Sequence, residues 1–284
     1  MTAAGGLKGL FGAIAKGLFG AIVHPSMASG EAAGSGAGTE LSAAWGGQPP
    51  PTLCLALADA ARAASERRVA AGDGALPLRL PVAAAVDKHE SRELGAGAAG
   101  KLAAGVAYAG QSVVVLPAGV PATVRVVRRC GAAAAAAAAG QAAEVGLSAP
   151  DAVALAAALR RGAVVAAASA PAPCARRLEC RVQTLELSIP LLRGAAVTLH
   201  AGAGAAPARV ARLVALHDPK TNAVTKAKPR AVAGRCAATI EVELSGAGET
   251  AVVEEYARCR PLGRVALRDG GATLAVGVVT KVLE

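Results

Sequence analysis

Basic side chains are the residues of this sequence whose type and spacing fit a defined chemistry, the binding of phosphate. Arg125, Arg128 and Arg129 lie at the end of an expected strand, and Arg160-Arg161 and Arg176-Arg177 flank a Pro-rich joint near residue 170. A further group lies on and after an expected hairpin: Lys220, Lys226, Lys228, Arg230 and Arg235. Each can contact phosphate, and a guanidinium can do so with two parallel hydrogen bonds. The alternative for any one of them is a solvated surface charge.

Motifs for catalysis and metal binding are absent from the sequence. It contains no G-x-x-x-x-G-K-[ST] phosphate loop, no G-x-S-x-G elbow and no H-E-x-x-H. The histidines are isolated from one another, and Cys174 and Cys180 lie six apart, which fits none of the usual zinc spacings. We therefore expect no catalytic residue, no intact nucleotide-binding residue and no metal ligand here. The 6 cysteines form no C-x-x-C pair and indicate reduced thiols in a cytosolic-type compartment.

Charge and composition favour a globular protein with a polyanionic partner. The 284 residues include 30 Lys and Arg against 20 Asp and Glu, a net charge of +10. The mean hydropathy of +0.44 excludes a disordered chain. Alanine makes up roughly a quarter of the residues, far above its usual share, whereas aromatic residues are only 2%. So few aromatics argue against base stacking and favour contact with the backbone of double-stranded RNA.

Short apolar runs separated by Gly and Pro predict a mainly β protein with two consecutive antiparallel β-barrels, after a short helical, partly disordered N-terminal segment. We expect a repeat-containing leader at 1–27, an edge and linker at 28–75, one barrel at 76–169 and another at 170–284. A helix is expected over Leu53–Arg68. The alanine run Ala132–Ala139 is assigned to a loop, with a helix as the alternative. The expected strands are Leu78–Val86, Gly100–Val106, Ser112–Leu116, Thr123–Val127, Ala142–Leu147, Ala163–Ala167, Leu178–Ile189, Ala195–His200, Ala208–Leu216, Ala237–Leu244, Thr250–Glu255, Gly263–Arg268 and Thr273–Val282.

Membrane and targeting signals are weak. The longest uncharged stretch, Leu102–Val124, contains prolines and glycines and predicts a buried strand rather than a spanning helix. At the N-terminus Lys8–Ile14 is repeated letter for letter at Lys16–Ile22, with apolar residues at helical spacing. A flexible leader, a membrane-surface helix and an organellar presequence all fit this repeat. We expect a cytoplasmic protein, with organellar targeting as the open alternative.

The C-terminal half carries four ordered motifs: Leu213–Thr221, Thr225–Arg230, Leu262–Asp269 and Thr273–Val279. Together they resemble the third domain of the translational GTPases of the elongation factor 1-alpha group. The segment Thr-Lys-Ala-Lys-Pro-Arg at 225–230 and the ending Gly-Val-Val-Thr-Lys-Val look most like the ribosome-rescue GTPase that partners Pelota, in its plant and algal form. The release-factor GTPase and elongation factor 1-alpha itself are the alternatives.

The resemblance extends upstream with less specific motifs. Pro77–Val82, Gly100–Leu102, Val115–Pro117 and Arg161–Val164 are similar to the second, β-barrel domain of the family. Gln141 departs from the pattern, since the family usually has Asp there. Ser29–Glu31 and Leu53–Ala60 look like the last loop and final helix of the GTPase domain. The phosphate loop, magnesium-binding motifs and guanine-reading motif of the family are missing, so we expect no GTP hydrolysis by this chain alone.

The resemblance implies a protein of translation that binds the small-subunit rRNA of the ribosome and Pelota, a tRNA mimic, in no-go and non-stop messenger-RNA surveillance. GTP and magnesium are implied only for the missing domain, and the protein is expected to be a monomer. The expected rRNA contacts are Arg125, Arg128 and Arg129. The expected partner contacts are Lys220, Lys226, Lys228, Arg230, Arg264 and Arg268. The alternatives are the equivalent part of a release-factor or elongation-factor GTPase, binding release factor or aminoacyl-tRNA, and a membrane-associated, Ala-rich binding protein.

Overall fold

The structure, a computed structural model, describes Leu57, Asp59, Ala60, Ala63 and residues 76–86, 94–218, 221, 223–246 and 248–283. The four isolated residues are helical, as expected within Leu53–Arg68. The leader at 1–27, its repeat, the proposed membrane association of that repeat, most of the edge at 28–75 and Lys220 lie outside the described residues. In the described part of the chain, no helix has the length and apolar character needed to cross a bilayer. The described residues from 76 onward belong to one compact unit.

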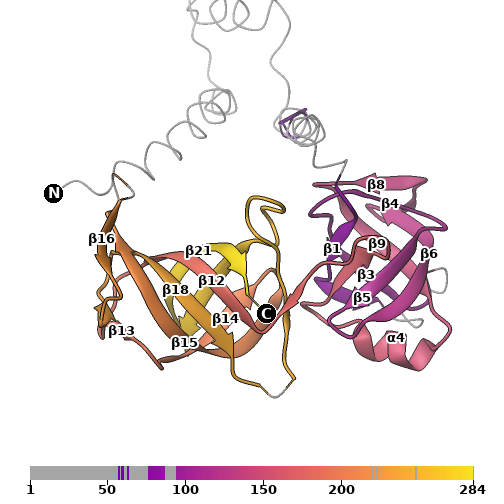
Figure 1. Cartoon of the computed structure of the whole chain (residues 1–284). Helices are drawn as coiled ribbons and strands as arrows, with labels where there is room; N and C mark the ends of the chain where they lie inside the picture. The colour runs from indigo at the N-terminus through magenta and orange to yellow at the C-terminus, as the bar shows by residue number, and fades with distance from the viewer. Residues whose placement is uncertain are drawn as a thin grey trace, which may run out of the picture. The chain divides into compact units, whose positions relative to one another are not determined.

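The first barrel is an antiparallel sheet in the order β1-β10-β5-β6-β9-β3-β2, with β7 paired to β6 (Figure 1). The backbone N–H of Arg79 donates to the Ala104 carbonyl and that of Ala103 to the Arg79 carbonyl, which joins the segment after β3 to β1. A separate pair, β4 and β8, completes the strands. The bounds are β1 Arg79–Pro81, β2 Ala84–Val86, β3 Gly97–Lys101, β4 Val106–Tyr108, β5 Ser112–Leu116, β6 Val120–Arg129, β7 Ala132–Ala133, β8 Ala136–Ala138, β9 Ala142–Ser148 and β10 Val164–Ala167.

Apolar alternation builds the interior of this barrel. In β5 the side chains of Val113 and Val115 are buried, and in β6 those of Val124 and Val127 are buried. They pack in one cluster with Leu80 and with Leu155 of α4, the helix Ala152–Ala158. The β-branched valines suit a pleated surface, and leucines and alanines fill the remaining interior positions.

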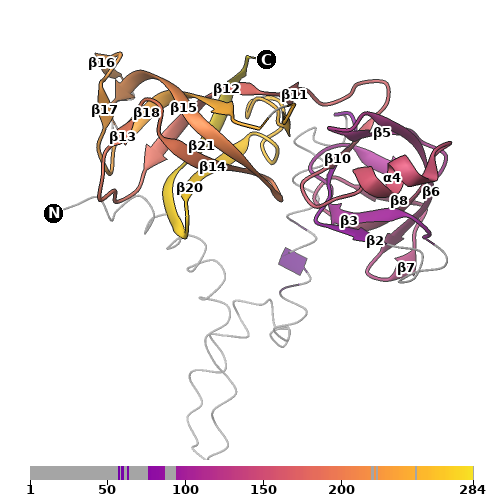
Figure 2. The ribbon, with the colours of Figure 1, turned by 90° about the horizontal axis from the view of Figure 1, so that it is seen from below.

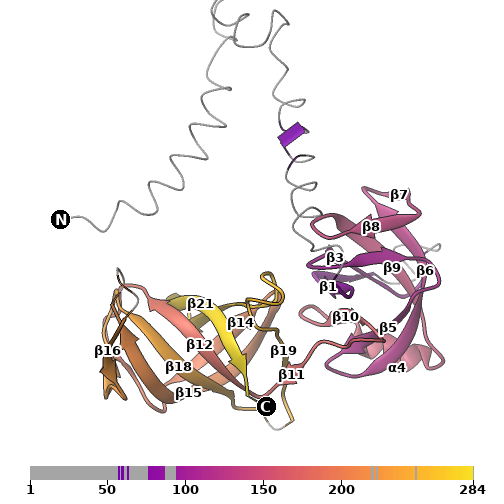
Figure 3. The same ribbon diagram turned by 45° about the horizontal axis from the view of Figure 1, so that its top comes forward.

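The second barrel closes on itself. Six strands form a ring in the order β14-β20-β21-β12-β18-β15, because β15 pairs with β14 as well as with β18 (Figures 2 and 3). β16 pairs with β15, and β11–β19 and β13–β17 are short two-stranded pairs. The bounds are β11 Cys174–Ala175, β12 Arg177–Thr184, β13 Leu191–Leu192, β14 Ala196–Ala201, β15 Gly204–His217, β16 Val224–Ala227, β17 Ala231–Val232, β18 Ala237–Leu244, β19 Ala251–Val252, β20 Arg264–Asp269 and β21 Ala272–Val282. The prediction of a mainly β protein with two antiparallel barrels is confirmed.

The alanine run is neither the expected loop nor a helix. Its first residues form β7, which folds back on β6, and Ala136–Ala138 form β8, which pairs with β4. Ala137 faces Ala107 across this pair, and both are fully buried. Strand pairing within the barrel therefore overrides the helix propensity of alanine.

Several other local predictions differ from the structure. The strand expected over Leu78–Val86 is divided into β1 and β2, and the strand expected over Thr250–Glu255 is only the two residues of β19. The strand expected over Gly100–Val106 is interrupted: β3 ends at Lys101, and Leu102–Gly105 connects it to β4. The strand expected over Leu178–Ile189 ends at Thr184. Its hydroxyl donates to the Ala233 carbonyl and accepts from the Cys236 N–H, which ties the strand end to the segment before β18. The α4 helix was not expected at all.

Candidate RNA and partner interfaces

The predicted arginine cluster of the first barrel lies along β6 and its hairpin with β7. Arg128 and Arg129 pair with Ala133 and Ala132, and the two-residue turn Cys130–Gly131 joins the strands. Both turn residues have positive φ, 50° and 80°, as type I′ hairpin turns require. Arg129 is exposed beside this turn. The hairpin therefore holds a cationic side chain out into solvent.

The other two arginines of this cluster have local contacts. Arg128 donates to the Gly131 carbonyl of the turn, and its guanidinium lies 4.0 Å from the carboxylate of Glu144, its cross-strand partner on β9. Arg125 is exposed and occupies a β-bulge, where the register with β9 shifts between Val124 and Val126. A bulge re-aims a side chain relative to the regular strand. The structure thus brings all three arginines onto one strand, and Arg128 also supports the turn.

The predicted partner residues fall into two groups in the second barrel. Lys226 lies on β16, Lys228 and Arg230 follow it, and all three are exposed. Lys228 has a φ of 46°, and its N–H donates to the Val214 carbonyl. Arg264 and Arg268 lie instead on β20, between β14 and β21. β20 lies between β14 and β21, whereas β16 pairs with β15, so the five described residues lie on two separate parts of the barrel.

The β20 arginines differ in their surroundings. Arg264 is exposed opposite Val278 of β21. Arg268 donates to the Gly271 carbonyl of the β20–β21 turn, while its Nε is buried without a hydrogen-bond partner. Arg268 therefore has a structural task in this hairpin, and Arg264 is the more accessible of the two.

The joint between the barrels contains a buried ion pair that the sequence analysis did not single out. Nε of Arg79 on β1 lies 2.6 Å from Oε1 of Glu254. The same guanidinium donates to the carbonyls of Leu78 and Ala170 at 3.0 and 2.8 Å. Arg79 thereby bonds its own barrel, the connecting segment and the second barrel. The only signal in the sequence is an arginine flanked by leucines in a strand, where alternation alone does not distinguish inside from outside.

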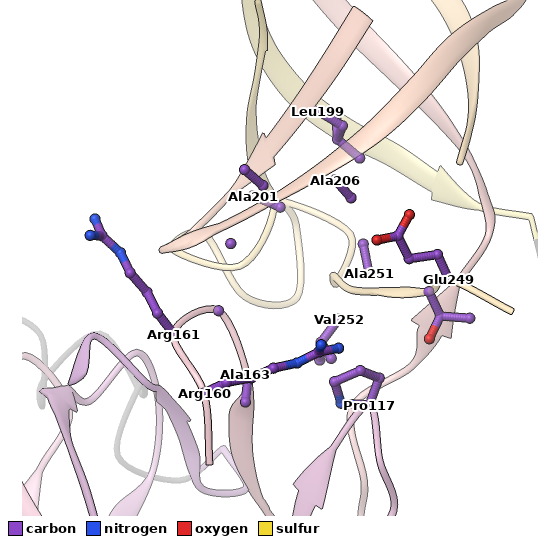
Figure 4. Close-up of a pocket in the computed structure, with 14 residues that line it drawn as sticks. Pro117, Arg160, Arg161, Ala163, Leu199, Ala201, Ala206, Glu249, Ala251 and Val252 are labelled. Atoms are coloured by element: carbon purple, nitrogen blue, oxygen red, sulfur yellow. The ribbon is translucent and has the colours of Figure 1, made fainter. Parts of the chain in front are cut away.

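A pocket of about 160 Å³ also lies where the two barrels meet (Figure 4). Arg160 and Glu249 both line it, and the Arg160 side chain runs toward Pro117. The Arg161 side chain points away from the pocket in the same view. One oxygen of Glu249 is buried without a hydrogen-bond partner. The lining thus holds two arginines, Arg160 and Arg161, and one carboxylate, that of Glu249.

The described cysteines form no disulfide with one another: Cys130, Cys174, Cys180, Cys236 and Cys259. Burial raises the pKa of Cys174, and burial together with the nearby Glu179 carboxylate raises that of Cys180 strongly. Both thiols therefore stay protonated at neutral pH, which disfavours nucleophilic chemistry. Among the described residues no group of three or more His, Cys, Asp or Glu is placed to hold a metal ion.

Comparisons with known proteins find similarity concentrated in the second barrel. Residues 177–280 match the family model described as GTP-eEF1A C-terminal domain-like. Protein HBS1 of Drosophila melanogaster is 34% identical over 121 residues, 43% of this chain and 18% of that protein. Elongation factor 1-alpha of Hyperthermus butylicus is 26% identical over 209 residues, 72% of this chain and 44% of the relative. The chain therefore spans less than half the length of these relatives.

Solved structures extend the likeness to both barrels. The crystal structure of sup35 complexed with GDP has a TM-score of 0.66 and covers 74% of this chain and 48% of its own. Its sequence identity is 23%, so this likeness concerns the fold. The complex with GMPPNP gives a TM-score of 0.65 over the same share.

Proposed function

We propose that this chain binds the ribosome and a Pelota-type partner in the rescue of stalled ribosomes. The premise is that the chain carries the C-terminal β-barrels of a translational GTPase of the elongation factor 1-alpha group. The observation that carries the proposal is the exposure of the segment that resembles the rescue GTPase. Its Lys226, Lys228 and Arg230 side chains stand on the surface of the second barrel. The similarity to Protein HBS1 over 121 residues supports the same subfamily.

The ribosome contact is assigned to Arg125, Arg128 and Arg129 of the first barrel. Arg129 is exposed beside a hairpin turn, and the hairpin geometry projects it without a conformational change. Phosphate contacts by arginine provide affinity that falls with salt and that does not depend on base identity. The binding is proposed to take place in the cytoplasm, by a monomer.

GTP and Mg²⁺ are proposed only for a protein that also contains a GTPase domain. A triphosphate site needs successive backbone N–H groups in a glycine-rich loop together with a lysine. Gly131 and Gly270, two of the described glycines with positive φ, lie in hairpin turns, and the sequence has no lysine-bearing phosphate loop. The residues of this chain do not fit the nucleotide, and we assign no step of hydrolysis to them.

Sedimentation with purified ribosomes tests the RNA half of the proposal. Arg129→Glu should weaken binding about tenfold and reduce the salt slope by about one, the effect of one lost phosphate contact. Lys281→Glu, an exposed charge reversal on β21 of the other barrel, is the matched control and should bind like the parent. Equal affinity and equal salt slope for Arg129→Glu and the parent would contradict the assignment.

A binding comparison tests the partner half. Purified Pelota, release factor and aminoacyl-tRNA are titrated separately against the full chain. Binding of Pelota with affinity well above the other two is expected. Preference for release factor would instead place the chain with the release-factor GTPase, and preference for aminoacyl-tRNA with elongation factor 1-alpha, which is also similar over 209 residues.

A further inference from the structure

Large apolar side chains are exposed at the end of the second barrel where β13, β16 and β17 lie, which we call the β16 end. The exposed fractions are 77% for Ile189, 59% for Val224, 49% for Leu192 and 40% for Leu185. Leu185 directly follows β12, and Leu192 pairs with Ala231 of β17. Figures 1 and 2 both show β13 and β16 at the same end of the barrel. Apolar side chains that gather on a surface mark an interaction site more often than scattered ones do.

The same end is strongly cationic. Its exposed basic residues are Arg193, Lys226, Lys228, Arg230 and Arg235. Two carboxylates stand against them, and both are engaged. Glu186 lies 3.1 Å from Arg235, and Asp218 accepts a hydrogen bond from the Thr221 N–H. Within the described chain, Arg193, Lys226, Lys228 and Arg230 have no ion-pair partner. The β16 end thus offers unneutralised positive charge beside exposed apolar surface.

Two of these cations sit in a backbone conformation that glycine would adopt more easily. Lys228 has a φ of 46° and Arg235 a φ of 58°. The left-handed region is strained for a non-glycine residue, because Cβ comes too close to the following carbonyl oxygen. Residues with a strained backbone concentrate at functional sites, where the strain lowers stability but the conformation serves function. At both positions the chain keeps a long cationic side chain where a glycine would relieve the strain.

We infer that the β16 end docks an acidic peptide segment that also carries aliphatic or aromatic side chains. The carboxylates of such a segment would meet the four unpaired cations, and its apolar side chains would cover Ile189, Leu192 and Val224. Complementary charge of this kind guides association, whereas buried apolar anchors hold the complex.

Other occupants fit the surface less well. An RNA backbone would satisfy the cations and leave the aliphatic side chains exposed, and the described aromatic residues, Tyr108 and Tyr256, lie elsewhere. A second copy of the chain would bring like charge to like charge. Pairing of a peptide strand with the edge strand β16 is disfavoured. β16 has only four residues and carries Lys226, and both a short edge strand and an edge lysine hinder such pairing.

The inference rests on the proposed function in one respect, namely that the second barrel carries a protein partner. The test uses fluorescence anisotropy of the full chain with a labelled twelve-residue peptide, Glu-Leu-Asp-Phe repeated three times. The comparison probes are the same peptide with alanine at every Leu and Phe, and a twelve-nucleotide uridine RNA. The parent should bind the first peptide about tenfold tighter than either comparison probe, since only it offers both charge and apolar anchors.

Paired variants separate the two halves of the surface. Ile189→Ser with Leu192→Ser should lose about tenfold in affinity for the first peptide, and Lys226→Glu with Lys228→Glu should lose at least as much and reduce the salt dependence. Val153→Ser, which removes an 81% exposed aliphatic side chain from α4, is the matched control for the first variant. Arg160→Glu with Arg161→Glu is the control for the second. Both controls should bind like the parent, and circular dichroism checks the fold of every variant.

Unchanged peptide affinity in the Ile189/Leu192 variant would overturn the inference. Equal binding of the RNA, lost in the Lys226/Lys228 variant, would overturn it in favour of a nucleic-acid surface. Failure of the parent to bind Pelota while it still binds the acidic peptide would contradict the proposed function alone. Pelota binding that persists while no variant affects the peptide would contradict this inference alone.

Discussion

The charged contacts of this protein differ widely in how far water screens them. The side chains of Arg79 and Glu254 are only 6% and 10% exposed, whereas those of Arg235 and Glu186 are 75% and 82% exposed. Water screens the second pair and leaves it with little net effect on stability. Removing one member of a buried pair leaves the other charge without solvent or partner, and the resulting loss of folding stability is large.

Glu254→Ala should therefore lower the free energy of unfolding by about 3 kcal/mol or more. Arg79→Met combined with Glu254→Leu should recover much of this loss, because two apolar side chains need no partner. Glu186→Ala is the matched control and should change stability by less than about 0.5 kcal/mol. Urea denaturation followed by circular dichroism measures all three. A Glu254→Ala effect as small as that of Glu186→Ala would contradict the structural role assigned to the buried pair.

The thiol of Cys180 provides a pH-dependent prediction. Its pKa is raised because burial and the adjacent Glu179 disfavour the thiolate. In the unfolded chain the thiol ionises near its ordinary value of 9.0. Above pH 9 the unfolded chain releases the Cys180 proton while the folded protein keeps it. The free energy of unfolding is therefore unaffected by this thiol below pH 9 and falls as the pH rises above 9.

Iodoacetamide labelling checks this residue directly. Exposed Cys130 should react within minutes at pH 8, and Cys180 should react only after unfolding in urea, as read by mass spectrometry of tryptic peptides. Rapid labelling of Cys180 in the folded protein would show that the thiol is accessible and ionisable.

At the scale of elements, α4 depends on its first residue. Asp151 accepts hydrogen bonds from the N–H groups of Val153 and Ala154, both at 2.9 Å. Asp151→Ala should cost about 1 kcal/mol of stability, and Asp151→Asn should cost only a few tenths, since asparagine caps equally well. Thermal unfolding of the two variants tests this. Equal losses for Ala and Asn would mean that the carboxylate acts through its charge and not as a cap.

Strands marked by short apolar runs between turn residues were predictable from the sequence, and elements defined by tertiary contacts were not. Ser112–Leu116 and Ala237–Leu244 form strands with the expected bounds because each combines apolar side chains with flanking turn residues. The α4 sequence has no polar residues whose spacing would indicate a helix. The one indication of a helix start is Asp151, which follows a proline and is the N-cap. β16 is exposed at every residue and shows no alternation at all.

The candidate sites show the same division. Arg128 and Arg129 are neighbours in sequence, so a single strand places both, and local reasoning suffices. Lys226 and Arg268 were predicted to contact the same partner because both are basic, but the strand order separates β16 from β20. The apolar half of the β16 end was missed because Leu185 and Ile189 continue the alternation of β12 after the strand itself has ended at Thr184.

At the scale of the whole described molecule, a continuous apolar seam joins the two barrels. Ala104, Leu116 and Val164 of the first barrel pack in one buried cluster with Val252 and Leu262 of the second. The Arg79–Glu254 pair lies at the same joint. A shared core of this kind couples the unfolding of both barrels.

We therefore expect the parent protein to unfold in one transition, with coincident curves from circular dichroism and hydrogen exchange of both barrels. Leu262→Ala, at a position 3% exposed, removes part of the seam and should cost about 2–5 kcal/mol. It should also separate the transitions of the two barrels. Two transitions in the parent would show that the seam does not couple them.

The alanine run has a consequence for how this gene can vary in length. Residues 132–139 are identical, so moving the run by one position presents the same atoms to β6 and β4. Gly131 and Gly140, both with positive φ, flank the run at its two ends. Insertion or deletion of an alanine need only lengthen or shorten the connection at 134–135 between β7 and β8. Copies of the gene that differ in this tract should therefore encode the same barrel.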